Sequence, residues 1–137
     1  MSQTIFPALR YRDAAGAIEF LTKAFGFTEV VAYRGDDGMV EHAQLDFRGT
    51  SIMLGQRREG EYDEITSDVA ASACYVVVAD TDAHFAHARA GGARIVKEPY
   101  EQDYGSRDYT AEDPEGNVWT FGTYPGAQVP RGGTVGR

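Results

Sequence analysis

Two segments of the chain place apolar residues at the spacing of an amphipathic helix. In the first, AAGAIEFLTKAFG, the apolar stripe consists of Ala14, Ala17, Ile18, Leu21 and Phe25. The second segment, TDAHFAHARAGG, begins beside Asp80 as the first begins beside Asp13. Both aspartates stand where an N-cap accepts hydrogen bonds from the free amides of the first helical turn. Both segments end in glycine, as helices often do, so the pattern predicts one helix after each aspartate.

Strand candidates flank both predicted helices. Each half of the chain begins with one, IFPALRY in the first half and ACYVVVA in the second. Two more follow each helix: FTEVVAYR and MVEHAQLDF in the first half, ARIVKEPY and SRDYTAE in the second. In the last strand of the chain, alternation predicts that Trp119 and Phe121 face the core, while Val118 and Thr120 face the other side.

The two halves repeat at a constant offset of 67 residues. Gly49 lies 36 residues after Asp13, and Gly116 lies 36 residues after Asp80. A second glycine follows six residues later in each half, in GTSIMLG and GNVWTFG. Each half therefore reads β-α-β-β-β, and the sequence predicts an α+β fold of two βαβββ modules.

The domain boundaries follow from this repeat. We predict a single domain over residues 1–126, with module one at 4–56 and module two at 71–124, since a chain of 137 residues is about the size of one domain. The polar residues 57–70 are expected to link the modules. The Gly- and Pro-rich tail at 127–137 has few apolar anchors and is expected to be flexible.

The stretch DPEGNVWTFG predicts a tight turn before the last strand. Asp113-Pro114 sets the chain up to turn, and both Gly116 and Asn117 tolerate left-handed backbone. Four β-forming residues then follow directly, so the turn is expected to start a strand.

The duplicated layout, the D-x-x-x-A-I-E-F-L opening of the first helix, the Asp-Pro-x-Gly-Asn turn and the ending WTFGTY together resemble the vicinal oxygen chelate superfamily. That superfamily includes glyoxalase I, extradiol dioxygenases and bleomycin resistance proteins. The resemblance covers residues from about 4 to 124 and is strongest to small single-domain glyoxalase-like members. It implies curled mixed sheets that form a cup with helices outside, in which two halves, often from two chains, enclose a ligand.

The resemblance also implies four positions for a divalent metal. Metal enzymes of this superfamily hold the ion with His, Glu or Gln side chains from the first and last strands of each half. The matching positions here are Phe6, Met53, Cys74 and Thr120, with Ser72 or Ala73 in place of Cys74 if the register slips. Phe6, Met53 and Thr120 are not useful ligands for such a metal. We therefore expect no metal and no cofactor, and glyoxalase I or dioxygenase activity is disfavoured.

Four polar residues remain as candidates for the concave side of the cup. In MVEHAQLDF the apolar alternate residues face the helices, so His42 is expected on the concave side. The repeat maps His42 onto Tyr109, and Arg107 alternates with Tyr109. Arg10 lies four residues after Phe6 and should share its face. A concave histidine is either a base or ligand contact, or a polar residue filling a wet cleft, and an arginine there needs a partner or an anion.

Other chemistry-bearing residues have simpler interpretations. Tyr62, Tyr100 and Tyr104 lie in acidic segments that would suit a flat, cationic ligand, although Tyr and acidic residues are also ordinary loop residues. His84 and His87 are expected on the solvated side of the second helix. Cys74 has no nearby cation in the sequence and is expected to be an inert thiol.

Composition and charge exclude several classes of protein. The formal net charge of −8 argues against nucleic acid as a partner, because phosphates require Lys and Arg. The sequence has no long apolar run, so no membrane span is expected. It begins without an apolar h-region and carries a single cysteine, which together favour a cytoplasmic location.

Two functions stay open at this point. In the first, a homodimer binds a small aromatic or cationic molecule without metal, and sequestration of that molecule is one outcome. The apolar floor of the site would be Phe6, Met53, Val118 and Thr120, and the polar contacts would be Arg10, His42, Arg107 and Tyr109. In the second, the protein is a lyase or isomerase of a small metabolite, metal-independent or with a rearranged metal site. His42 would then carry the proton, and Arg107 would stabilise an enolate or carboxylate.

Overall fold

The computed structural model describes residues 3–58 and 72–127, and it contains two βαβββ modules. The elements of module one are β1 (Ala8–Tyr11), α1 (Ala14–Phe20), the π-helical turn η1 (Leu21–Phe25), β2 (Thr28–Arg34), β3 (Val40–Phe47) and β4 (Thr50–Gln56). The elements of module two are β5 (Ala73–Val77), α3 (Thr81–Ala90), β6 (Arg94–Glu101), β7 (Arg107–Glu112) and β8 (Val118–Gly122). The predicted α+β fold class is confirmed. The boundaries within 57–70 and the tail at 127–137 fall largely outside the described residues and stay predictions.

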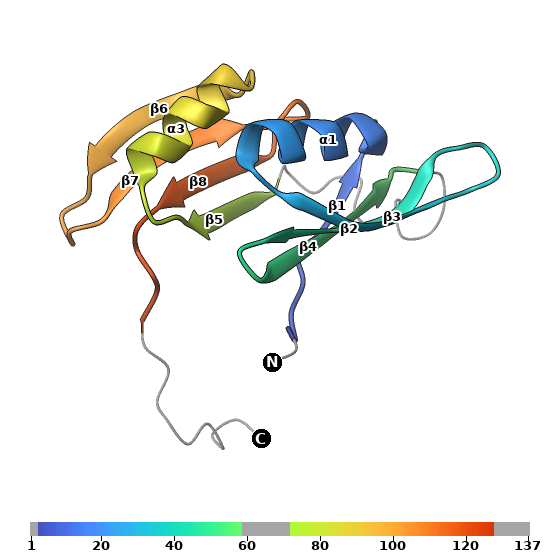
Figure 1. Ribbon diagram of the computed structural model, residues 1–137, viewed down its shortest axis with the longest axis horizontal. Helices are drawn as coiled ribbons and strands as arrows, with labels where there is room; N and C mark the ends of the chain where they lie inside the picture. The colour runs from blue at the N-terminus through green and yellow to red at the C-terminus, as the bar shows by residue number, and fades with distance from the viewer. Residues whose placement is uncertain (1–2, 59–71, 128–137) are drawn as a thin grey trace, which may run out of the picture.

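Each module forms one four-stranded mixed sheet. The strand orders are β1-β4-β3-β2 and β5-β8-β7-β6. In each sheet the first and last strands of the module run parallel, and the other pairs are antiparallel. Figure 1 shows α1 and α3 next to each other on the same side of the two sheets. Among the described residues, no helix has the length and apolar character needed to cross a membrane.

Both helices begin as the aspartate pattern predicts. The Asp13 side chain accepts a hydrogen bond from the Gly16 amide at 3.0 Å, and the Asp80 side chain accepts one from the Ala83 amide at 3.0 Å. These bonds satisfy amides that have no partner inside the helix. Gly26 ends the first helical segment with a φ of +87°, which a glycine adopts without steric cost.

The two modules share one aromatic core. The Phe25 ring, at the end of η1, lies 5.7 Å from the Trp119 ring and 4.8 Å from the Phe121 ring of module two. Phe27 adds a contact of 5.6 Å with Trp119. Trp119 and Phe121 are 1% and 0% exposed, so the predicted core face of the last strand is confirmed. The helix-facing sides of both sheets are therefore covered within one chain.

A buried carboxylate joins the modules at the turn before β8. Asp113 is 4% exposed and accepts hydrogen bonds from the Tyr11 hydroxyl at 2.6 Å and from the Trp119 indole N–H at 3.1 Å. Burial, followed by the nearby Asp113 charge, raises the pKa of Tyr11 far above its usual value, so Tyr11 stays a donor. This network ties β1 of module one to β8 of module two.

The turn itself differs from the prediction at one residue. Gly116 adopts the left-handed backbone, with a φ of +88°. Asn117 does not; its side-chain amide donates to Asp113 at 3.1 Å and its oxygen accepts from the Ser72 amide at 2.9 Å. Asn117 therefore serves the turn through its side chain, which bridges to the start of β5.

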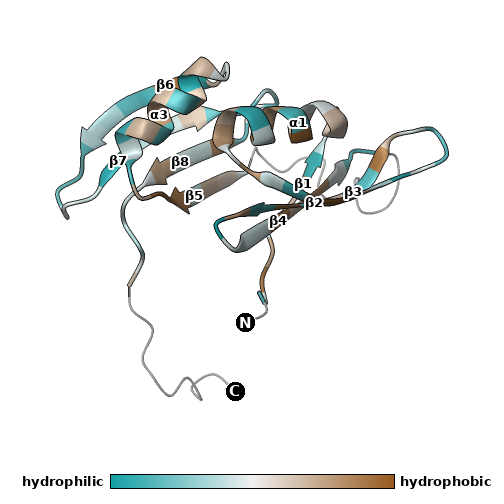
Figure 2. Cartoon of the chain, viewed as in Figure 1, coloured by the Kyte–Doolittle hydropathy of each residue, from teal (hydrophilic) through white to brown (hydrophobic). Residues whose placement is uncertain are grey.

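The edge strand β5 is more apolar than most of its sheet. Figure 2 shows β5 as a hydrophobic strand, whereas β6 at the opposite edge is largely polar. Tyr75 and Val77 on β5 are each 41% exposed. An exposed apolar edge strand is a typical site of association between chains.

Replacing Asp113 with asparagine should destabilise the protein strongly. We expect the free energy of unfolding to fall by about 2–4 kcal/mol, because buried donors would lose a charged acceptor. Urea unfolding followed by the fluorescence of the single tryptophan measures this change. The exposed Asp103→Asn substitution is the control and should stay within about 0.5 kcal/mol of the parent protein. Equal effects of the two substitutions would contradict the role assigned to Asp113.

Candidate functional site

The face of each sheet that lies opposite the helices is called the open face here. In module two, Thr120 pairs with Tyr75 on one side and with Thr110 on the other, so these three side chains share the open face. In module one, Met53 pairs with Ala8 and Gln44. Partners directly across a sheet project to the same face, so these residues line the open face of module one.

The four positions that the resemblance implies for a metal are partly rearranged. Met53 and Thr120 lie on the open faces, as predicted, and both are half-buried. Phe6 precedes Ala8 by two residues, and the Met53 amide bonds the Pro7 carbonyl at 2.9 Å, so alternation puts Phe6 on the open face as well.

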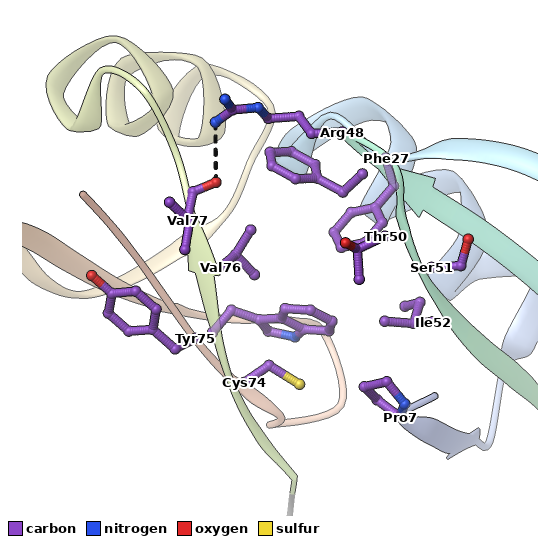
Figure 3. Close-up of a pocket in the computed structure, with 12 residues that line it drawn as sticks. Pro7, Phe27, Arg48, Thr50, Ser51, Ile52, Cys74, Tyr75, Val76 and Val77 are labelled. Atoms are coloured by element: carbon purple, nitrogen blue, oxygen red, sulfur yellow. Dashed lines mark hydrogen bonds between the residues drawn. The ribbon is translucent and has the colours of Figure 1, made fainter. Parts of the chain in front are cut away.

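On β5 the first choice, Cys74, does not lie on the open face, whereas the alternative, Ala73, pairs with Val118 and does. Cys74 pairs with Trp119, which faces the helices, and lines a pocket together with it. Tyr75 is the residue that pairs with Thr120. Figure 3 shows the Cys74 and Tyr75 side chains pointing in different directions, although both residues line the pocket. Tyr75 lies two residues after Ala73 on the same face of β5, and sequence reasoning did not single it out.

The open-face residues do not fit a divalent metal. Phe6, Met53 and Thr120 offer no strong ligand, and the Tyr75 hydroxyl already donates to Asp108 at 2.9 Å. Burial is the largest effect on Tyr75 and raises the pKa of its hydroxyl, which disfavours the phenolate that a metal would need. Across residues 3–58 and 72–127, no group of three or more His, Cys, Asp or Glu side chains is arranged to hold a metal.

Asp108 organises the polar end of the module-two open face. It is 1% exposed, and its Oδ1 atom accepts hydrogen bonds from Ser106 at 2.6 Å and from Tyr75 at 2.9 Å. Its Oδ2 atom accepts from the Gln102 amide at 3.0 Å. Burial alone would raise the pKa of Asp108, but the hydrogen bonds from Ser106, Gln102 and Tyr75 outweigh it and lower the pKa. Asp108 is therefore a buried, fully bonded carboxylate.

Gly122 leaves the space in which this group assembles. A Cβ atom on Gly122 would overlap the Asp108 carboxylate and the Tyr75 hydroxyl. The glycine at this position of the repeat is thus explained by close approach of side chains across the open face.

Two predicted site residues face the helices instead. Tyr109 pairs with Phe121, is 0% exposed, and its hydroxyl lies 2.6 Å from His84 Nδ1. Arg107 forms ion pairs with Asp82 of α3 at 3.0 Å and with Glu101 at 3.4 Å. The prediction that both side chains lie on the concave side is wrong.

The cause of this error is a difference of one residue between the two β-hairpins. In module one Gln44 faces Met53, nine residues later in the chain. In module two Thr110 faces Thr120, ten residues later. The offset of 67 therefore maps His42 onto the wrong side of β7, because a shift of one residue reverses the face of a strand.

His42 and Arg10 are oriented as predicted. Ala43 and Leu45 on β3 are fully buried on the helix side, so His42, which directly precedes Ala43, faces the open side. Its ring stacks on Tyr33 with centroids 6.1 Å apart. Arg10 pairs with Gly55, and a Cβ atom there would lie 2.9 Å from the Arg10 guanidinium. The ligand roles of His42 and Arg10 stay predictions.

His84 is part of the junction between modules, not of a solvated face. Its Nε2 atom lies 2.9 Å from the Phe25 carbonyl oxygen, and its ring stacks on Phe121 at 4.2 Å. Burial is the largest effect on His84 and lowers its pKa. The expectation failed because α3 packs beside η1, which only tertiary structure reveals. His87 is exposed, as predicted, and its Nε2 atom lies 3.0 Å from the Lys23 carbonyl oxygen.

The tyrosines predicted at the mouth of the site have partners within the protein. The Lys97 ammonium lies 3.8 Å from the centre of the Tyr100 ring, so a cation of the protein itself already covers one face of that ring. Tyr104 is 60% exposed and packs edge-on against Tyr124 at 5.3 Å. Tyr62 lies outside the described residues.

A pocket of about 390 Å³ lies between the modules, along the outer edge of β5 (Figure 3). Its floor contains Phe27, Phe47 and Trp119, and Arg48 reaches across it to donate to the Val77 carbonyl at 3.2 Å. Of the positions singled out from the sequence, Cys74 lines this pocket, and the seven predicted ligand-binding residues do not. It is a feature of the module junction rather than of the open faces.

Comparisons with known proteins agree with this fold. A family model described as the Glyoxalase/Bleomycin resistance protein/Dioxygenase superfamily matches residues 5–121. An uncharacterized protein of Mycobacterium bovis is 35% identical over 121 residues, which cover 85% of this chain and 80% of that protein. An uncharacterized protein of Mycobacterium tuberculosis is also 35% identical, over 85% of this chain and 71% of its own length.

Solved structures show the same arrangement. The crystal structure of TioX from Micromonospora sp. ML1 is 29% identical and has a TM-score of 0.78, covering 89% of this chain and 98% of TioX. A glyoxalase/bleomycin resistance protein/dioxygenase family enzyme from Burkholderia phytofirmans is 23% identical, with a TM-score of 0.69 over 86% of this chain and 95% of that enzyme. The latter similarity concerns the fold alone.

The stability of the protein should depend on pH through His84. Because its pKa is lower in the folded state, the unfolded chain takes up a proton first as the pH falls. Stability should be complete above the unfolded value of about 6.5 and should fall below it, by up to about 1.4 kcal/mol per pH unit, until the folded pKa is reached. Urea unfolding of the parent protein and of His84→Gln between about pH 5 and 8 measures the difference. His87→Gln is the exposed control, and an unchanged pH slope in His84→Gln would contradict this role.

The open faces should not bind divalent metals. Elemental analysis of protein purified without chelators is expected to find well below one metal per chain, because the side chains at the four positions are poor ligands. Added zinc, nickel or iron(II) should leave the melting temperature unchanged. Stoichiometric metal in the purified protein would show that another group of side chains forms a metal site.

Proposed function

The chain belongs to the glyoxalase/bleomycin resistance protein/dioxygenase superfamily, and on this premise we propose that it binds a small organic molecule without a metal. The site is a cleft between module one of one chain and module two of a second chain. Holding the molecule in this cleft, and so sequestering it, requires no covalent step.

This proposal rests on one observation: in each sheet one face is buried within the chain and the other is not. Phe25 and Phe27 of module one pack on Trp119 of module two, so the helix-facing sides of the two sheets are buried within the chain. The open faces keep half-buried side chains such as Met53 and Thr120 without a covering layer from the described residues. A second chain that covers them would create an enclosed site.

The edges of the sheets support pairing with a second copy. β1 and β5 each lie at one edge of their sheet, and in the described part of the chain each pairs with a single strand. Ile5, beside β1, is 82% exposed, and Tyr75 and Val77 on β5 are each 41% exposed. A two-fold dimer in which β1 of each copy lies beside β5 of the other would cover all three side chains. The pocket along β5 would be covered by the same contact.

The composite cleft would be mostly apolar, with a few polar groups. Module one contributes Phe6 and Met53, together with His42 and Arg10 at its polar positions. Module two contributes Thr120 and its neighbours across the sheet. Such a lining is typical of sites that bind small molecules.

A complementation experiment tests whether the cleft is composite. Met53→Arg and Thr120→Arg each place a long cation on one open face, and each variant alone should lose binding of the tightest ligand from a thermal-shift screen. In a mixed dimer, one cleft carries both substitutions and the other carries neither. Refolding the two variants together should therefore restore about a quarter of the parental binding capacity, since about half of randomly formed dimers are mixed. Isothermal titration calorimetry measures the number of sites.

Three results would contradict this proposal. Full binding by both single variants would mean that the open faces are not the site. No recovery on mixing, with both variants folded by circular dichroism and dimeric by sedimentation, would mean that each cleft belongs to one chain. Turnover of the ligand that disappears in His42→Ala would show that the protein is an enzyme rather than a binder.

A further inference from the structure

We propose that Tyr75 is the residue by which the cleft selects its ligand, and that its ring is a fixed platform on which a flat, uncharged aromatic ring stacks. This inference rests on the binding function proposed above and names the class of ligand. Tyr75 was not among the residues that the sequence singled out for this site.

The Tyr75 side chain lies along the open face instead of standing away from it. Its Cα atom is paired with Thr120 on the neighbouring strand. Its hydroxyl lies against Gly122, two residues further along β8, close enough to overlap a Cβ atom built there. Because its Cα atom lies beside Thr120 and its hydroxyl lies beside Gly122, the side chain runs across the open face toward β8, and Tyr75 is still 41% exposed.

The hydroxyl of Tyr75 is anchored from both sides. It donates to Asp108 at 2.9 Å and accepts from the backbone amide of Tyr124 at 3.0 Å. Asp108 is itself held by Ser106 and Gln102. The ring is therefore already ordered before a ligand arrives, and stacking on it costs little side-chain entropy.

In the described part of the chain, the polar and charged side chains named below, which lie near the ring, have partners within the protein. The hydroxyls of Thr110 and Thr120 bond to each other at 3.0 Å. The Asp108 carboxylate is 1% exposed and bonded to its three donors, so it is not presented to the cleft. The nearby Lys97 ammonium is placed over the Tyr100 ring. These contacts favour recognition through an aromatic face over recognition through charge.

A matched pair of neutral probes tests this selection. Naphthalene-2-carboxamide is flat, and decahydronaphthalene-2-carboxamide has the same head group on a saturated ring system. We expect the parent protein to bind the flat probe about tenfold more tightly. Tyr75→Leu should remove most of that difference by weakening only the flat probe. Tyr75→Phe keeps the ring but loses the hydrogen bonds of the hydroxyl. Its preference for the flat probe should lie between those of the parent protein and Tyr75→Leu. Calorimetric titration measures the affinities, and circular dichroism confirms that each variant is folded.

The possible outcomes test the stacking role of Tyr75 separately from the existence of the cleft. Equal affinities of the parent protein for the two probes, or an equal loss of both in Tyr75→Leu, would overturn the stacking role and leave the composite cleft intact. Tighter binding of tetraethylammonium than of the flat probe would overturn the choice of an uncharged ligand. Binding of neither carboxamide would also overturn the proposed ligand class, while the mixed-dimer experiment independently decides whether a cleft exists. A tenfold preference that disappears in Tyr75→Leu would support the platform.

Discussion

The rest of the structure depends on the hydrogen bonds that the buried Asp113 carboxylate accepts. It receives the Tyr11 hydroxyl from module one and the Trp119 indole from module two, in a site that is 4% exposed. In the same turn, the Glu115 carboxylate accepts hydrogen bonds from the amides of Arg12 and Asp13, at 2.7 and 2.8 Å, just before α1 begins. The turn therefore positions both modules and the first helix together. Buried charged groups are costly unless they are bonded, so these donors act as a unit.

Joining the modules in this way determines which surfaces remain for function. The helix-facing sides meet through the Phe25, Trp119 and Phe121 rings and form a common core. Each sheet then has one face without a covering layer from the described residues, and each has an edge strand beside the junction. Such a protein gains an enclosed cleft most directly by pairing with a second copy of itself. The open face of one copy then covers the open face of the other.

The chemistry of the open faces separates this chain from the metal enzymes of its superfamily. On the paired strands β5 and β8, the positions facing the cleft are Tyr75 and Thr120 rather than metal ligands. Asp108, the buried carboxylate nearby, is committed to three donors from the protein. The space beside Gly122 is filled by this hydrogen-bonded group, which orders an aromatic ring. The same fold thus presents an apolar and aromatic surface where a metal centre would need strong ligands.

The sequence by itself determined the elements, the helix caps at Asp13 and Asp80, the two-module repeat and the core face of the last strand, since each depends on local spacing. Alternation with Trp119 and Phe121 placed Thr120 correctly, and the resemblance to the superfamily placed Met53 correctly. Only the tertiary structure decided the faces of β5 and β7 and the burial of His84. The strand faces depend on inter-strand register, and the second hairpin pairs residues one position further apart than the first. A shift of one residue reverses a face while leaving the local pattern plausible, and the contact of α3 with η1 has no local pattern at all.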